Sequence, residues 1–306
     1  MPNRKETDLI SVEKRSTGLF EGERGLVITG VFGLVLALGI AIFIFFHGSV
    51  ILPHGNVEDA FSFNAAVGLF TLSIAAILPL TNFEGRKKGR IRWLFIGAVL
   101  YAYAVETIQN FRGIQPRFTE EGTILDIIAG ILFAIDSMLL VVLSVILMIH
   151  FFRMKNPLNR PLLIIGIRYA FLSVLIANLA GIWMILLQGR FTGDAGNLIV
   201  LHGMGFHSLQ ALIFPAWIMD RISIMKQFHV SLIHYGSLAW LLSLILMSIQ
   251  TALGRTVFEP TLFPIIIVIL LLFWLGTVLV GIRNFIKEKL KITRQTNQVS
   301  LEKEGK

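Results

Sequence analysis

GLVITGVFGLVLALGIAIFIFFH, residues 25–47, is an apolar run without a single Asp, Glu, Lys or Arg. About 20 such residues cross the hydrocarbon of a bilayer as a helix, in which the backbone hydrogen bonds are all internal. Similar runs recur along the 306-residue chain. The fold class is therefore predicted as all-α, a polytopic integral membrane protein with a bundle of about eight transmembrane helices. The predicted spans are 25–47, 59–80, 92–112, 123–151, 162–187, 196–219, 230–253 and 262–285.

The composition supports this prediction. Hydrophobic residues make up 55% of the chain and charged residues 15%, and the mean hydropathy of +0.76 lies outside the range of ordinary soluble domains. Cysteine is absent, which excludes disulfides, thiolate metal ligands and iron–sulfur clusters.

The basic residues are unevenly distributed between the two sides of the predicted membrane domain. One set of loops holds only Arg112, Arg117, Arg190 and Arg255, and Arg168 lies inside the fifth span. All other lysines and arginines fall in the two tails and the second, fourth and sixth loops, so positive-inside logic places both termini in the cytoplasm of a cell-membrane protein. The net charge of +8 is then juxtamembrane, and the expected partner is the lipid bilayer and not nucleic acid.

Three segments are predicted. Residues 1–24 form a cytoplasmic N-terminal tail, and residues 25–286 form the eight-helix transmembrane domain. Residues 287–306 form a cytoplasmic C-terminal tail, predicted to be disordered because the run is polar and free of aromatics. No motif positions common to the two halves are recognised, so a four-plus-four repeat is not predicted.

Ionisable and amide side chains inside the spans are the candidates for function, because such groups are costly in hydrocarbon unless they are paired. Helical rise places them in the outward half of the third to sixth spans, where we expect one polar cavity that opens outward. The predicted intramembrane polar site consists of Glu106, Gln109, Asp136, Asn178, His202, His207 and Gln210.

The segment LHGMGFHSLQ, residues 201–210, is the densest part of this site. At 100° per residue, His202, Gly203, Gln210 and His207 share a face about 140° wide, which must look into the bundle. The two histidines are too far apart in angle to chelate one metal in the manner of a zinc helix, so a metal site is not predicted. His207 lies nearest the bilayer centre, and Asp136 at similar depth is its expected partner, either in a proton relay or in a structural contact.

Histidines also occur near both membrane faces, an arrangement that suits two haems stacked across a bilayer. The alternative interpretation is interfacial side chains with polar tips in water and, inside the bundle, helix–helix contacts. The candidate haem ligands are His47, His54, His150, His202, His207, His229 and His234.

Three functions remain open from the sequence. The first is a proton-coupled small-solute transporter that uses the midplane polar residues. The second is a non-catalytic membrane assembly or sensor protein, whose partners are membrane proteins or a second copy of the chain. The third is a membrane haem or quinone oxidoreductase, and whether the protein is an enzyme therefore stays undecided.

Overall fold

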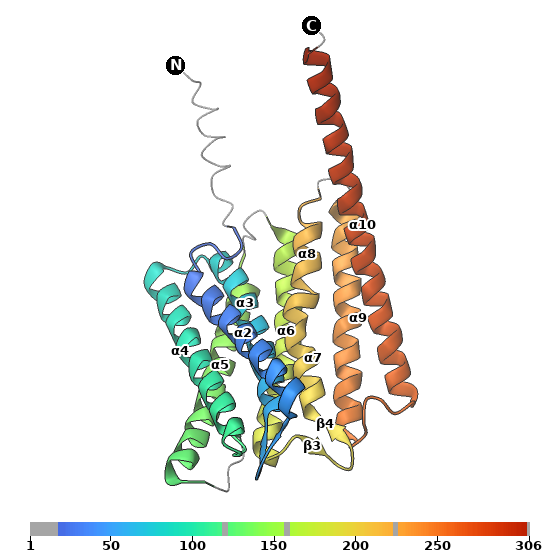
Figure 1. Ribbon diagram of the computed structural model, residues 1–306. Coiled ribbons are helices and arrows are strands. Elements are labelled where there is room, and N and C mark those ends of the chain that lie inside the picture. Colours follow the sequence, from blue (N-terminus) through green and yellow to red (C-terminus); the bar gives the residue numbers. More distant parts are fainter. Residues whose placement is uncertain (1–17, 118–121, 156–159, 223–225, 305–306) are drawn as a thin grey trace. The chain divides into compact units, whose positions relative to one another are not determined.

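The computed structural model describes residues 18–117, 122–155, 160–222 and 226–304 (Figure 1). It confirms the all-α membrane fold, because the described residues contain eight helical segments that are long and apolar enough to cross a bilayer. The chain divides into two compact units, Met1–Asn159 and Arg160–Lys306, called unit 1 and unit 2 below.

The helices of unit 1 are α2 (Arg24–His47), α3 (Val57–Ile77), the short 3-10 helix η1 (Leu78–Thr81), α4 (Gly85–Phe111) and α5 (Ile124–Arg153). Unit 2 contains α6 (Pro161–Leu187), α7 (Leu198–Ala211), α8 (Ile213–Met219), α9 (Lys226–Ala252) and α10 (Leu262–Glu304). Each unit also has one two-stranded antiparallel hairpin, formed by β1 (Val50–Ile51) and β2 (Gly55–Asn56) in unit 1 and by β3 (Phe191–Thr192) and β4 (Gly196–Asn197) in unit 2.

In unit 1, α2 and α3 form a closely packed helical hairpin. A side chain at Gly30 would lie 3.0 Å from the carbonyl oxygen of Gly68, so the two backbones meet where both residues lack a Cβ. Small residues at facing positions let membrane helices approach in this way. At the end of the unit away from the β1–β2 hairpin, the fully buried Glu23 accepts hydrogen bonds from Arg92 at 2.6 and 2.8 Å, and Lys88 lies 3.2 Å from it.

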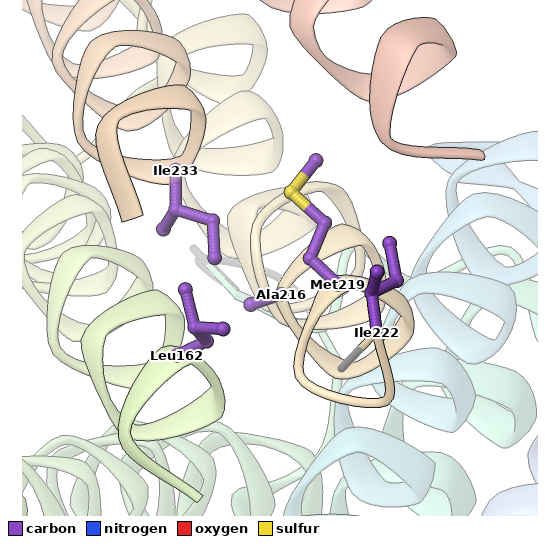
Figure 2. Packing of buried hydrophobic residues seen from close by; sticks show 5 residues of the cluster. All are labelled: Leu162, Ala216, Met219, Ile222 and Ile233. Carbon is purple, nitrogen blue, oxygen red and sulfur yellow. The ribbon is translucent and has the colours of Figure 1, made fainter. Parts of the chain in front are cut away.

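In unit 2, α6 and α7 also approach closely at a glycine, since a Cβ at Gly205 would lie 2.9 Å from the carbonyl oxygen of Ser173. Apolar side chains then close the end of the unit away from the β3–β4 hairpin. Figure 2 shows this cluster, which joins α6, α8 with the turn after it, and α9 through Leu162, Ala216, Met219, Ile222 and Ile233.

The sixth span is interrupted between α7 and α8 at Leu212. Pro215 follows three residues later, and proline has no N–H to donate to the preceding turn. The helical hydrogen-bond pattern resumes directly afterwards, where Ala216 N donates to the carbonyl oxygen of Leu212 at 3.4 Å. The proline therefore distorts the span without ending it.

The two units repeat one architecture, a four-plus-four repeat that the sequence analysis did not predict. A shift of 141 residues takes the pair Val50–Asn56 of the first hairpin onto Phe191–Asn197 of the second. In both, the Asn side chain caps the next helix, with Asn56 accepting from Glu58 N at 3.1 Å and Asn197 from Ile199 N at 3.0 Å.

The helices follow the same order of contacts. In unit 1, α2 packs on α3 and α4, α3 on α4, and α4 on α5; in unit 2, α6 packs on α7 and α9, α7 on α9, and α9 on α10. The sequence signal is weak but present, as TIQNFRG (107–113) at the end of α4 matches SIQTALG (248–254) at the end of α9 under the same shift. Each unit is therefore one copy of a four-span module.

One boundary differs from the sequence prediction. Helix α10 continues to Glu304, through most of the segment 287–306 for which the sequence predicts a disordered tail. The run KEKLKITRQTNQVSLEKE contains neither glycine nor proline, and its lysines, glutamates and glutamines have good helix propensity. Nothing in its composition therefore stops the eighth helix at the end of its apolar part.

Candidate functional site

Each hairpin is held against the C-terminal end of the third span of its unit, which is α4 in unit 1 and α9 in unit 2. In unit 1, His54 N donates to the carbonyl oxygen of Gly113 at 2.9 Å, and Asn56 N donates to Asn110 Oδ1 at 3.0 Å. In unit 2, Ala195 N donates to the carbonyl oxygen of Gly254, also at 2.9 Å. We call this end of each unit the hairpin end, and the glycine contact the hairpin clamp.

Glycine is required in the clamp for two reasons. Gly113 has φ 76° and Gly254 has φ 72°, in the left-handed region that residues with a Cβ rarely adopt. A Cβ at Gly113 would also overlap the carbonyl group of Leu52, and one at Gly254 would lie 2.9 Å from Gly193 Cα. The clamp therefore depends on these two glycines in the same way in both units.

Two buried carboxylates near the hairpin end of unit 1 are neutralised by arginines from the loop after α4. Glu106 is fully buried, and its two oxygens accept from Arg117 Nη2 at 2.7 Å and Nε at 3.2 Å. Asp126 accepts from Arg112 at 2.5 and 3.3 Å and from Gln109 Nε2 at 3.0 Å. Glu106 and Gln109 are therefore parts of ion-pair networks that join α4, the loop and α5.

Asp136 differs from these carboxylates. It lies near the middle of α5 and is half-buried, and among the described residues its Oδ2 atom has no hydrogen-bond partner. Tyr101 of α4 interacts with it electrostatically, and the Tyr101 hydroxyl donates to the carbonyl oxygen of Ala129 at 2.9 Å. Asp136 is thus a carboxylate at mid-span with a free acceptor.

The remaining residues of the predicted polar site belong to unit 2. Asn178 is buried on α6, and His202 of α7 has its Nδ1 atom 2.8 Å from the carbonyl oxygen of Ala177, so the imidazole joins α7 to α6. His207 is exposed, with Nδ1 3.3 Å from Gln210 Oε1 one turn further on. Because Glu106 and Asp136 belong to unit 1, the single cavity predicted to be lined by Glu106, Asp136, His202, His207 and Gln210 stays a prediction, as does the pairing of His207 with Asp136.

Of the other candidate haem ligands, His47, His150 and His229 lie near helix ends, His54 lies in the β1–β2 hairpin, and His234 lies in the first half of α9. In unit 1, His47 Nδ1 is 3.3 Å from the carbonyl oxygen of Phe43, His150 Nε2 is 2.6 Å from that of Thr81, and His54 belongs to the hairpin. In unit 2, His234 Nδ1 is 2.9 Å from the Tyr169 hydroxyl, and His229 Nε2 is 3.3 Å from Asn284 Nδ2. The 141-residue shift brings no histidine of one unit onto a histidine of the other.

The polar residues are distributed differently in the two copies of the module. The shift takes Glu106 to Met247 and Arg117 to Phe258, and it takes His207 back to Ala66. Unit 1 thus carries the intramembrane carboxylates and their arginines, and unit 2 carries the histidines of α7 and α9. No group of three histidine or carboxylate side chains within the described ranges is placed to hold a metal ion.

Sequence reasoning missed the pairings that the structure shows, Arg117 with Glu106 and Arg112 with Asp126, because the path of the loop after α4 is not visible from helical periodicity. It also missed the hairpin clamp, for which the available signals were the shared Gly-Asn pairs at 55–56 and 196–197 and the shared Ile-Gln pairs at 108–109 and 249–250. No protein family model, curated protein or solved structure matches this chain.

Proposed function

We propose that this multi-pass membrane protein moves a small solute across the bilayer in exchange for protons, and that Asp136 carries the proton. The observation that supports this proposal is the contrast among the carboxylates of unit 1. Glu106 and Asp126 are held by arginines, whereas the Oδ2 atom of Asp136 has no partner in the described part of the chain. A carboxyl group that takes part in no ion pair is free to bind and release a proton, which is what proton coupling requires.

The repeat adds support from the architecture. Each unit contributes four spans, an even number, so both copies would enter the membrane from the same side. Repeats in the same orientation occur in several families of secondary transporters, whose alternating access arises from movement of one repeat against the other. The proposal includes a cell-membrane location, cytoplasmic termini and hairpin ends that face outward, as the distribution of basic residues predicts.

The proposal is tested first by chemical labelling of the full-length protein in lipid vesicles. Dicyclohexylcarbodiimide is an apolar reagent that reacts with protonated carboxyl groups. We expect it to modify Asp136, with a yield that falls as the pH rises, and to modify Glu106 and Asp126 far less because their oxygens are bound by arginine side chains. Peptide mass spectrometry reads all three sites in one sample, so the paired carboxylates are the internal control.

The second test is proton movement in proteoliposomes that contain a trapped pH-sensitive dye. A panel of amino acids, sugars and organic cations is added outside, and we expect at least one solute to drive a proton flux that Asp136→Asn abolishes while the variant keeps its melting temperature. A solute-driven flux of normal size in Asp136→Asn, or no labelling of Asp136 between pH 5 and 8, would contradict the proposed role. That pH range covers the titration of carboxyl groups in polar and apolar surroundings.

A non-catalytic assembly role is favoured by a different observation, namely that several polar side chains within the spans bond to backbone carbonyl groups of neighbouring helices. Examples are His202 with Ala177, Ser208 with Ala170, and Tyr101 with Ala129. In that case Asp136→Asn leaves every transport assay unchanged and alters only stability. The haem or quinone function is checked separately by the absorption spectrum of protein purified from haem-supplemented cells.

A further inference from the structure

The hairpin end of unit 2 contains a cavity of about 320 Å³ that the proposed function does not use. It lies between the β3–β4 hairpin, the first turn of α7 and the loop that follows α9. Its lining residues are Phe191, Asp194, Ala195, Asn197, Val200, Thr256, Val257 and Phe258. The volume lies within the usual range of small-molecule sites.

The lining has one charge and two aromatic rings. Asp194 is the only lining residue with a charge; its side chain is exposed and forms no ion pair with any other described residue. Phe191 and Phe258 are 53% and 83% exposed, so their rings are available to a ligand. The guanidinium of Arg190 already lies 5.2 Å from the centre of the Phe191 ring, which is a cation–π distance. A carboxylate beside exposed aromatic rings is suited to a cation.

The equivalent region of unit 1 already contains a cation of its own. The shift takes Arg117 to Phe258, and the register is supported by matching turns, in which Arg117 N donates to Gln115 Oε1 at 2.6 Å and Phe258 N donates to Thr256 Oγ1 at 3.3 Å. In unit 1 the guanidinium of Arg117 is bound by Glu106 and lies 5.5 Å from the ring centre of Phe63. In unit 2 a ring stands at the position of that guanidinium, so this position carries no cation, although Arg190 lies beside the Phe191 ring.

We propose that the unit 2 cavity binds a small organic ammonium ion of the methylated, choline-like class. Asp194 neutralises its charge, and Phe191 and Phe258 contact its methyl groups through their ring faces. An anion is disfavoured because the one charged lining group is acidic. A divalent metal is disfavoured because it needs about six oxygen ligands, while only one carboxylate is present and Asn197 Oδ1 already caps α7.

The site is independent of the proton-coupling proposal, because all its residues belong to unit 2 and Asp136 belongs to unit 1. The ammonium group has two possible sources, a free solute in water and the choline headgroup of a lipid. Both present the same trimethylammonium chemistry to the cavity, and the experiment below distinguishes them.

The test uses full-length protein in nanodiscs of phosphatidylglycerol, which has no ammonium group, and measures binding of tetramethylammonium chloride by calorimetry against sodium chloride of equal ionic strength. We expect saturable binding that Asp194→Asn and Phe258→Ala each weaken about tenfold, a change that corresponds to the upper part of the cation–π range. Phe258→Trp should keep or improve the affinity, since the indole ring is the best cation–π partner. Asp136→Asn should bind normally, which separates failure of this site from failure of the proton-coupling proposal.

The matched control is Phe45→Ala, because Phe45 has the same exposed fraction of 83% but lies on α2 of unit 1. If Phe258 serves only to anchor its loop among lipid headgroups, both alanine variants retain full tetramethylammonium binding, and the proposal is overturned. It is equally overturned if tetramethylammonium and sodium give the same signal. Nanodiscs with phosphatidylcholine then identify the source: competition with tetramethylammonium indicates a lipid headgroup, and unchanged affinity indicates a free solute.

Discussion

Arg117 and Glu106 form the ion pair on which the hairpin end of unit 1 depends. Glu106 is fully buried and Arg117 is one-quarter exposed, so removal of the guanidinium leaves an uncompensated charge in an apolar site. We expect Arg117→Met to lower the free energy of unfolding by on the order of 3 kcal/mol. The detergent melting temperature is the measurement, and Arg255→Met, at an exposed arginine in the equivalent loop of unit 2, is the control.

The double variant Glu106→Met/Arg117→Met distinguishes a structural ion pair from a functional one. Met247 already stands at the position of unit 2 equivalent to Glu106, which indicates that the module folds with methionine there. We expect the double variant to recover much of the lost stability, because a matched apolar pair carries no buried charge. A double variant as unstable as the single one would mean that the two residues do not act as a pair.

The hairpin clamp occurs once in each unit, so the same prediction can be tested at two positions of the chain. Gly113→Ala and Gly254→Ala should each destabilise the protein by on the order of 2 kcal/mol, because alanine strains the left-handed backbone and its Cβ meets the hairpin. Gly39→Ala and Gly276→Ala, within helices with no atom within 4 Å of the added Cβ, should be neutral or slightly stabilising. Melting temperatures of the four variants test whether both units use the same clamp.

The spans were predictable because their physical cause is local. An apolar run of sufficient length forms a membrane helix whatever its neighbours, and α2, at Arg24–His47, begins and ends within one residue of its prediction. The hairpins were not predictable in this way, since two-residue strands such as Val50–Ile51 carry no period-two pattern. Their existence depends on long-range bonds to Gly113 and Gly254, which lie more than 50 residues further along the chain.

For the candidate site, the sequence predicted how deep each residue lies in the bilayer but not which residues it contacts. The positions of Glu106 and Asp136 along their helices follow from helical rise alone, whereas the path of the loop that carries Arg117 does not. Glu106 has a structural partner, and Asp136 remains as the carboxylate with a free acceptor.

Because the chain contains no cysteine, its topology can be measured with single-cysteine variants without first removing any native cysteine. Single cysteines at His54 and Asp194, one in each hairpin, should react with a membrane-impermeant maleimide in intact cells. Cysteines at Lys87 and Lys155, at the opposite ends of spans, should react only after permeabilisation. Labelling of Lys87→Cys in intact cells would contradict the predicted orientation. Labelling of only one of the two hairpin cysteines in intact cells would show that the two units are not inserted in the same orientation.

The repeat predicts that each unit folds as a module. Residues 1–159 and 160–306, expressed separately, should each insert into the membrane and resist proteolysis, because the clamp, the capped helix and the helix contacts of each unit lie within it. Protease protection of the two hairpin clamps in isolated membranes is the measurement. If either half is synthesised at the level of the full-length protein but is degraded rapidly, that unit does not fold without the other one.

Helix α10 has 43 residues, which at 1.5 Å per residue corresponds to a rod about 65 Å long. The hydrocarbon layer is about 30 Å thick, so the apolar part that ends at Ile286 is long enough to cross it, and the polar remainder of the helix would then lie outside the hydrocarbon. A helical rod that leaves the membrane without a glycine or proline is a natural attachment point. A rigid soluble protein joined in helical register after Glu304 would serve as an alignment marker for electron microscopy of this 34.2 kDa membrane protein.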